Sequence, residues 1–385
     1  MSRRNIVLLG ATGSIGQSTC RVARDLPGRL RIAGMSGFRN IEKLAAQANQ
    51  LRPEALAVPD EKAAAELRAG LDYTPAQIFT GEEGLCHLAA WGGADMVLVA
   101  IVGMGGLRPT LAALEAGKDI ALASKEVMVV AGEIVMAAAQ ARGGRILPVD
   151  SEHNAIFQCL EGRDPRHVKR LILTASGGPF RTWPREKLCA VTRADALRHP
   201  TWRMGEKITI DSATLFNKGL EMIEARWLFG LPVEQIGVVI HPQSIVHSMV
   251  EFVDGSVLAQ MSHSDMRFPI QYALTWPDRI EGSLPPLEFA KLGKLDFEEP
   301  RCDIFPALDL ARQAAGRGGT APAVLNAANE VAVAEFLAGR IAFPKIWEIV
   351  ASVLGRSADA PAADLAALMS ADRAARELAV KCAGE

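Results

Sequence analysis

The chain has 385 residues, of which 49% are hydrophobic and 22% are charged, the balance of a globular protein with two or three domains. Its formal net charge of −2 excludes a general affinity for nucleic acid or membrane surfaces, so any anion site must be local. The longest strongly apolar run, residues 96–102, is too short to span a membrane. The first strand begins too early for a targeting peptide, and the six cysteines lack metal or redox spacing. We therefore expect a cytoplasmic protein with reduced thiols.

The first motif is a glycine turn between a strand and a helix. Residues 5–9 form a buried-strand pattern that runs into GATGSIG at 10–16, and a helical pattern follows. In a dinucleotide site, Gly10 would permit the tight turn, Gly13 would let the backbone approach a pyrophosphate, and Gly16 would let the helix pack closely. The G-x-x-G-x-x-G spacing departs from G-x-G-x-x-G, and the alternative is a plain glycine turn.

The end of the second predicted strand indicates which nicotinamide cofactor would bind. The strand covers residues 31–35, and SGFRN at 36–40 lacks the acid that binds a ribose 2′-hydroxyl in an NAD site. Arg39 is placed to bind a 2′-phosphate, which favours NADPH over NADH. The alternative is a solvated arginine at a helix start, a position that the helix dipole disfavours.

Strand and helix patterns continue to alternate through the first half of the chain. Further strands are predicted at 55–58, 95–102 and 119–123, with helices at 61–69 and 107–116. This alternation predicts a doubly wound parallel sheet, a Rossmann-like α/β fold. Lys125 follows the last of these strands, on the side where such sheets bind ligands, and it could contact substrate oxygens or pair with an acid. The alternative is a surface lysine.

Two acids follow the next predicted strand, residues 145–149. Asp150 and Glu152 are two positions apart, so in an extended segment they would point to the same side. Like charges at close range repel, and a hard divalent cation offsets that repulsion. The alternative is a pair of solvated acids beside the next helix, which Asp150 or Ser151 could cap.

The densest polar cluster of the chain lies at 211–221. Ser212, Asn217 and Lys218 supply a hydroxyl, an amide and a cation, which suit a phosphate monoester. If one helix runs from Ser212 onward, Asn217 and Glu221 are i, i+4 neighbours. Glu221 could then complete a three-carboxylate site with the two earlier acids, and oxygen ligands suit magnesium or manganese. The alternative is a helix with a solvated polar face.

Two loops in the middle of the chain are further candidates. SGGPF at 176–180 follows a predicted strand at 171–175, and its amides and hydroxyl could bind an oxyanion or form an ordinary turn. HPTWRMG at 199–205 places Trp202 and Met204 in a loop, although such side chains prefer burial. A lid that closes over a ligand would explain them, and the alternative is a loop packed permanently on the core.

The last part of the chain predicts a small all-α domain. A proline-richer linker precedes helical patterns at 307–317, 321–337, 345–354 and 372–381, and NAANE at 326–330 is expected at an interface between domains. The predicted organisation is an NADPH-binding domain at 1–149, an α+β catalytic domain at 150–275, a linker at 276–301 and a C-terminal helical domain at 302–385.

Eight motifs carry a resemblance that spans nearly the whole chain. They are GATGSIG at 10–16, LASKE at 122–126, PVDSEHNAIFQ at 148–158, SGGPF at 176–180, HPTWRMG at 199–205, DSATLFNKGLE at 211–221, HPQSIVHSMV at 241–250 and LNAANE at 325–330. As an ordered set they resemble the 1-deoxy-D-xylulose 5-phosphate reductoisomerases. Two departures are Ala11, where a serine is common, and Ser124, where an asparagine is common. Arg39 aligns with a lysine in some members.

The resemblance implies an enzyme of the non-mevalonate isoprenoid pathway. It would rearrange 1-deoxy-D-xylulose 5-phosphate with Mg²⁺, Mn²⁺ or Co²⁺ and reduce the product with NADPH to 2-C-methyl-D-erythritol 4-phosphate. A homodimer without nucleic-acid or membrane partners is implied. Two alternatives are an NADP-dependent dehydrogenase of another phosphorylated aldehyde or ketose, and a non-catalytic NADPH-sensing protein.

The resemblance also implies roles for individual residues. The metal ligands would be Asp150, Glu152 and Glu221, which with Lys125 form the catalytic set. The residues that bind the substrate would be Lys125, Ser151, Glu152, Ser176, His199, Trp202, Met204, Ser212, Asn217, Lys218, Glu221 and Met266. The cofactor would contact Gly10, Thr12, Gly13, Ser14, Ile15, Gly37, Arg39, Asn40, Ile101, Ser124, Glu126 and Gly205.

Overall fold

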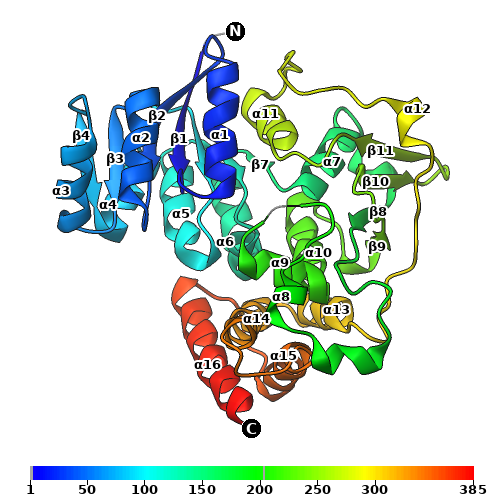
Figure 1. The fold of residues 1–385 in the computed structure, drawn as a ribbon. Helices are drawn as coiled ribbons and strands as arrows, with labels where there is room; N and C mark the ends of the chain where they lie inside the picture. Colours follow the sequence, from blue (N-terminus) through cyan, green and yellow to red (C-terminus); the bar gives the residue numbers. More distant parts are fainter. Residues whose placement is uncertain (1–2, 203) are drawn as a thin grey trace. The chain divides into compact units, whose positions relative to one another are not determined.

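The computed structural model describes residues 3–202 and 204–385 (Figure 1). The chain folds into two compact units. The first runs to Val127 and adds Val135–Asn154 and Asp265–Pro285, and the second comprises Met128–Ile134, Ala155–Ser264 and Pro286–Glu385. The predicted domain boundaries stay a prediction. Among the described residues, no helix combines the length and hydrophobicity needed to cross a bilayer.

The first unit contains a seven-stranded sheet in which every pairing is parallel, as predicted. In chain order its strands are β1 (Arg4–Leu9), β2 (Leu30–Ser36), β3 (Ala55–Val58), β4 (Gln77–Thr80), β5 (Met96–Val99), β6 (Asp119–Leu122) and β7 (Ile146–Pro148). The sheet order is β4-β3-β2-β1-β5-β6-β7. The direction of winding reverses between β1 and β5, and ligands of doubly wound sheets bind at the carboxyl ends of strands at such a point.

The first unit also contains helices, most of which connect these strands. They are α1 (Ser14–Asp25), α2 (Ile41–Leu51), α3 (Glu61–Gly70), α4 (Gly81–Ala89), α5 (Leu107–Glu115) and α11 (Arg267–Thr275), with a 3₁₀ turn η1 at Gly103–Gly106. Two more, α6 (Lys125–Arg142) and α7 (Ser151–Leu160), have residues in both units. Strand β5 ends three residues earlier than the predicted strand at 95–102. Its neighbours β1 and β6 end at Leu9 and Leu122, both opposite Val99, so within the described part of the chain no strand pairs with residues 100–102.

The glycine turn is closed by contacts between backbones. Gly10 has a φ of +87°, and a Cβ there would lie 2.4 Å from the carbonyl oxygen of Ala100. A Cβ on Gly16 would lie 2.3 Å from the carbonyl oxygen of Gly10. Only glycine permits both approaches, so the start of α1 is held against the ends of β1 and β5.

The second unit contains a mixed four-stranded sheet in the order β11-β10-β8-β9. Its strands are β8 (Val168–Ala175), β9 (Ile236–Ile240), β10 (Val246–Phe252) and β11 (Val257–Met261). Strand β10 runs antiparallel to β8 and β11, and β8 runs parallel to β9. This sheet and the helices that lie between its strands in the sequence are the α+β part that the sequence predicted.

The second unit also contains short and long helices. The short ones are α8 (Arg193–Ala196), α12 (Phe289–Leu292) and the 3₁₀ turns η2 (Pro165–His167), η3 (Arg185–Ala190) and η4 (Val233–Gln235). The longer ones are α9 (Glu206–Thr214), α10 (Phe216–Phe229), α13 (Ala307–Arg317), α14 (Ala321–Leu337), α15 (Lys345–Arg356) and α16 (Leu365–Gly384). The last four are the predicted C-terminal helices, gold to red in Figure 1. Helix α16 begins earlier than predicted because the Asp364 side chain caps it by accepting from the Ala367 amide at 2.8 Å.

We predict opposite effects for two glycine-to-alanine changes within helices. Gly16→Ala places a methyl group against backbone atoms in α1 and should lower the free energy of unfolding by about 1–3 kcal/mol. Gly355→Ala, in open space in α15, should raise it by about 0.5–1 kcal/mol because alanine favours helix. Guanidinium denaturation measures both. An unchanged free energy of unfolding in Gly16→Ala would mean that α1 can move away from the turn.

Candidate functional site

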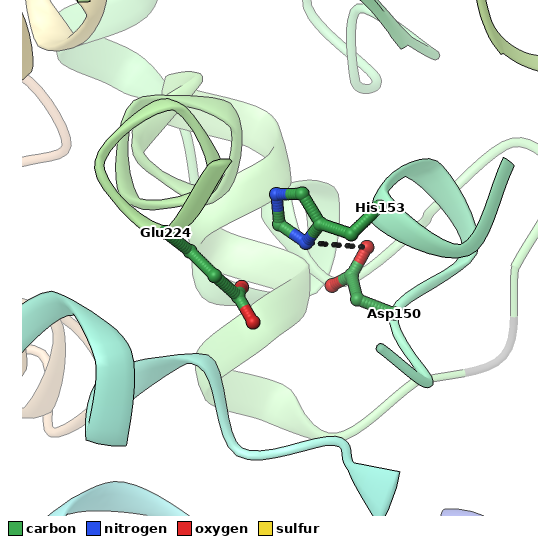
Figure 2. A group of neighbouring side chains, drawn as sticks. All are labelled: Asp150, His153 and Glu224. Carbon is green, nitrogen blue, oxygen red and sulfur yellow. Dashed lines mark ion pairs between the residues drawn. The ribbon is translucent and has the colours of Figure 1, made fainter. Parts of the chain in front are cut away.

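The acidic cluster of the first unit forms where β6 and β7 end. Lys125 begins α6, and Asp150 lies directly before α7. Lys125 Nζ lies 2.6 Å from Asp150 Oδ2, with the two side chains only 7% and 11% exposed. His153 Nδ1 lies 3.9 Å from the other Asp150 oxygen, the pair joined by a dashed line in Figure 2. Lys125 and Asp150 are thus an ion pair shielded from water.

The expectation of an extended segment at 150–152 is wrong. Glu152 lies in the first turn of α7, and its amide donates to Asp150 Oδ1 at 3.3 Å, as in a helix cap. The two acids are nonetheless close, with one carboxylate oxygen of each within 4.8 Å of the other. The start of a helix favours negative charge, and Ser151 Oγ donates to the Glu152 carboxylate. Capping and mutual proximity therefore coexist here.

Two buried ionisable side chains, His153 and Glu224, were not predicted from the sequence. His153 is fully buried beside Asp150, three positions along the same helix start. Glu224 lies on α10, one turn after Glu221, and both are 1% exposed; Figure 2 labels it. The i, i+3 spacing was the available signal in each case, since such residues share a helix face.

The helix predicted to run on from Ser212 is broken at Leu215. Helix α9 ends at Thr214, Leu215 is left-handed with φ 65° and ψ 5°, and α10 begins at Phe216. The Thr214 hydroxyl donates to the Ile210 carbonyl at 3.0 Å, and the Leu215 amide donates to the Ser212 carbonyl. These bonds satisfy the end of α9 and let the chain turn. The junction formed by residues 211–219 is called the α9–α10 junction below.

Asn217 and Glu221 were predicted to be i, i+4 neighbours, and they are in contact on α10. The Asn217 side-chain amide donates to the Glu221 carboxylate, and Lys218 donates to its other oxygen. Lys218 and Glu221 are both buried, so their charges are compensated away from water.

Three polar side chains of the second unit form a compact group, the serine–histidine cluster of Ser176, His199 and Ser212. His199 Nε2 lies 3.0 Å from each serine hydroxyl, and the two hydroxyls are 3.5 Å apart. His199 Nδ1 accepts the amides of Thr201 at 3.2 Å and Trp202 at 2.9 Å. Since Nδ1 is an acceptor, the proton is on Nε2, and burial lowers the pKa of His199 to about 4. The cluster is therefore neutral and rich in donors near pH 7.

The glycine pair after Ser176 sets this geometry. Gly177 and Gly178 both have positive φ, +82° and +68°, and a Cβ on Gly178 would lie 2.8 Å from the Ser212 carbonyl oxygen. The Gly178 amide donates to Ser176 Oγ at 3.2 Å. The turn can therefore pack directly on α9, which brings Ser176 to Ser212.

The loop at 199–205 packs on the second sheet. The rings of Trp202 and His247 lie 6.1 Å apart, and Trp202 and Met204 are half-buried. Thr201 Oγ1 lies 3.4 Å from Ser244 Oγ. Arg203 lies outside the described residues, and Gly205 is the N-cap of α9. These contacts are those of a packed loop, and its closing over a ligand stays a prediction.

Apart from Gly205 of the second unit, the predicted cofactor residues lie at the carboxyl ends of β1, β2, β5 and β6. Ser36 ties the first two strands, since its hydroxyl accepts the Gly10 amide at 3.0 Å and its carbonyl accepts the Ala11 amide at 2.8 Å. Ser124 donates to the Ile101 carbonyl and so ties β6 to β5. Thr12 to Ile15 form the turn and the start of α1, and Glu126 is buried in the first turn of α6.

Arg39 is exposed at the end of β2, beside exposed Phe38, with Gly37 buried before them. Within the described ranges, the Arg39 guanidinium has neither an ion pair nor a hydrogen bond. Asn40 follows it and caps α2 by accepting the Lys43 amide at 2.9 Å. Arg39 thus precedes the cap and is available to an anion. Met266, also of the first unit, is the half-buried N-cap of α11.

The family models and the relatives that match this chain all carry the name of one enzyme. A model described as 1-deoxy-D-xylulose 5-phosphate reductoisomerase matches residues 6–132, one described as that enzyme's C-terminal domain matches 146–229, and one described as the DXP reductoisomerase C-terminal domain matches 261–378. The chain is 56% identical over 382 residues to the 1-deoxy-D-xylulose 5-phosphate reductoisomerase of Symbiobacterium thermophilum, covering 98% of each chain. Identity to that of Pseudomonas syringae pv. tomato is 50% over 386 residues, 98% of this chain and 97% of the relative.

Solved structures agree. The reductoisomerase from Zymomonas mobilis in complex with NADPH superposes with a TM-score of 0.93 at 43% identity, covering 99% of both chains. A DOX-P reductoisomerase in complex with NADPH, fosmidomycin and magnesium gives a TM-score of 0.92 at 42% identity, covering 99% of this chain and 98% of the other.

We predict that the buried histidines make stability pH-dependent on the acid side. Burial lowers the pKa of His199 and His247 from 6.5 to about 4. Between these values the unfolded chain binds protons that the folded chain excludes, so the free energy of unfolding falls as pH drops from 6.5 towards 4 and is insensitive to these groups above 6.5. His199→Gln should flatten that dependence in denaturation at several pH values. An unaltered slope would contradict the neutral state of His199.

Proposed function

The chain belongs to the 1-deoxy-D-xylulose 5-phosphate reductoisomerase family and is an NADPH-dependent enzyme of that family, and we propose which of its residues carry the reaction. The substrate is 1-deoxy-D-xylulose 5-phosphate and the product 2-C-methyl-D-erythritol 4-phosphate. The observation that carries the assignment beyond the fold is the serine–histidine cluster beside the α9–α10 junction, because neutral donors with a buried lysine suit a phosphate dianion. A cytoplasmic homodimer is part of this proposal and rests on the resemblance.

The phosphate is assigned to the second unit. His199 Nε2–H and the hydroxyls of Ser176 and Ser212 would donate to its oxygens, replacing the bonds they make to one another. Asn217 and Lys218 would add an amide and a charge from the start of α10. Trp202, Met204 and Met266 would exclude water from the bound sugar.

A divalent cation is assigned to Asp150, Glu152 and Glu221. The donor chemistry fits, since three carboxylates offer the oxygen ligands that magnesium prefers, and Asp150 and Glu152 already lie close together. When bound, the cation polarises the carbonyl and hydroxyl oxygens of the substrate. Lys125 and Ser151 would hold those oxygens in place by donating to them, and the Lys125 charge offsets the repulsion between Asp150 and Glu152.

NADPH is assigned to the carboxyl edge of the parallel sheet. The pyrophosphate would lie at Gly10, Thr12, Gly13, Ser14 and Ile15 at the start of α1, where free amides and the helix dipole favour anions. Gly37, Arg39 and Asn40 would bind the adenosine 2′-phosphate, and Ile101, Ser124, Glu126 and Gly205 would contact the rest of the cofactor. When bound, NADPH supplies the hydride that reduces the rearranged aldehyde.

The function is tested by incubating the protein with 1-deoxy-D-xylulose 5-phosphate, NADPH and Mg²⁺. Nicotinamide absorbance should fall, and NMR should show the branched skeleton of 2-C-methyl-D-erythritol 4-phosphate. Glu152→Gln should lose orders of magnitude in turnover with the fold intact, because Ser151 can still donate to the amide oxygen while a metal ligand loses its charge. A straight-chain reduced product would instead indicate a dehydrogenase of a phosphorylated aldehyde or ketose. Undisturbed turnover in Glu152→Gln would remove that residue from the metal site.

Cofactor preference tests the assignment of Arg39. Wild type should strongly prefer NADPH over NADH. Arg39→Ala should weaken NADPH binding by about 1.5–3 kcal/mol, the range for hydrogen bonds to charged groups, and leave NADH nearly unaffected. Steady-state kinetics with both cofactors measure this ratio. Arg24→Ala, which removes an exposed arginine bonded to Gln50 on the same unit, is the control and should leave the ratio intact. Equal use of both cofactors by wild type would disprove the prediction that the end of β2 selects NADPH through Arg39.

A further inference from the structure

Asp211 is a buried carboxylate with no role in the assignments above. It lies directly before Ser212 on α9 and is 1% exposed. Lys207 Nζ, one turn earlier on the same helix, lies 2.6 Å from one carboxylate oxygen. Asn329 Nδ2, on α14, donates to the other oxygen at 2.8 Å. A carboxylate is costly to bury unless it is paired and hydrogen-bonded, and these two partners make its position specific.

Asn329 is the part of this arrangement that comes from the C-terminal helices. It is fully buried on α14, 118 positions from Asp211 in the sequence. A hydrogen bond to an ionised carboxylate is shorter and stronger than one between neutral groups. The contact therefore ties α9 to α14 at Asp211.

That point adjoins the residues assigned to the phosphate. Ser212 comes from the last turn of α9, and Asn217 and Lys218 come from the first turn of α10, so one short junction carries all three. Helix α13 holds the far side of the junction, since a Cβ on Gly219 would lie 2.9 Å from the Cβ of Ala311. The junction is thus clamped before and after Leu215 by two C-terminal helices.

We propose that Asn329 is a positioning residue for the phosphate of the substrate, acting through Asp211. This rests on the proposed function of the serine–histidine cluster and the α9–α10 junction. The Asn329–Asp211 bond holds the last turn of α9 so that Ser212 Oγ stays 3.0 Å from His199 Nε2. Without it, a buried carboxylate oxygen loses its donor and α9 shifts to reach another partner. A small displacement of a positioned group is enough to weaken a multidentate contact.

The test compares two asparagines of one helix. Asn326 and Asn329 are both fully buried on α14, but the Asn326 side-chain amide donates to Glu330 of its own helix at 3.0 Å. The readout is kcat/KM for 1-deoxy-D-xylulose 5-phosphate divided by kcat/KM for unphosphorylated 1-deoxy-D-xylulose. Asn329→Ala should lower this ratio by about tenfold, the scale of one hydrogen bond to a charged group, with the loss mostly in KM for the phosphorylated substrate. Asn326→Ala should leave the ratio at its wild-type value.

A second pair of variants keeps the test decisive if Asn329→Ala does not fold. Asp211→Asn retains an oxygen that accepts from Asn329 and should retain the ratio, whereas Asp211→Ala removes the acceptor and should lower it. A second readout needs no turnover. The rise in Tm that inorganic phosphate produces in wild type should shrink in Asn329→Ala and Asp211→Ala and persist in Asn326→Ala.

The outcomes separate this proposal from the function itself. Wild type that does not turn over the phosphorylated substrate overturns the proposed function, and the phosphate-induced Tm shifts still decide the role of Asn329. Active wild type with the same ratio in Asn329→Ala and Asn326→Ala would reduce Asn329 to a purely structural residue. Loss of the ratio in Asp211→Asn as well as Asp211→Ala would mean that the Lys207 ion pair, and not the Asn329 bond, positions the junction.

Discussion

The buried ion pair of Lys125 and Asp150 constrains the carboxyl edge of the first unit. Parallel pairing places Leu122 opposite Pro148, so the residues that follow β6 and β7 emerge side by side. Lysine at the first position of a helix is unfavourable to the helix dipole, and aspartate before one is favourable. The pair joins these two helix starts, offsetting the lysine's unfavourable position and holding Asp150 where its second oxygen meets the amide of Glu152. A charged edge is thereby stable within an otherwise apolar sheet.

In the second unit, buried charges are compensated by ion pairs within the consecutive helices α9 and α10. Lys207 with Asp211 and Lys218 with Glu221 each place a lysine and an acid one turn apart, and in both pairs the acid is almost fully buried. Pairing within a helix places each compensating charge one turn away from the acid. Lys218, which is assigned to the phosphate, and Glu221, which is assigned to the cation, can therefore both be buried before either ligand binds. The neutral His199 fits this pattern, because an imidazolium there would add an uncompensated charge.

The sequence predicted the sheet and most helices of the fold because buried strands and glycine turns leave local patterns, such as those at 5–9 and 10–16. It predicted the proximity of Asp150 and Glu152 from an extended geometry that does not exist, and so overlooked His153 on the same helix start. The break at Leu215 has no local signal, since leucine rarely adopts positive φ and is held there by burial. The early start of α16 did have a local signal, the capping residue Asp364. The bond from Asn329 to Asp211 joins distant segments, which no local pattern encodes.

The closure of the glycine turn by backbone atoms alone has an evolutionary corollary. Its geometry is set by Gly10 and Gly16 against carbonyl groups that every residue carries, so drift at the intervening positions leaves the interlock intact. Ala11, one of these positions, takes part through its backbone, since a Cβ on Gly16 would lie 2.4 Å from its carbonyl oxygen. Residues 38–40 at the end of β2 are exposed and contribute nothing to the interlock. Cofactor preference and the integrity of the fold are therefore separable traits, open to selection one at a time.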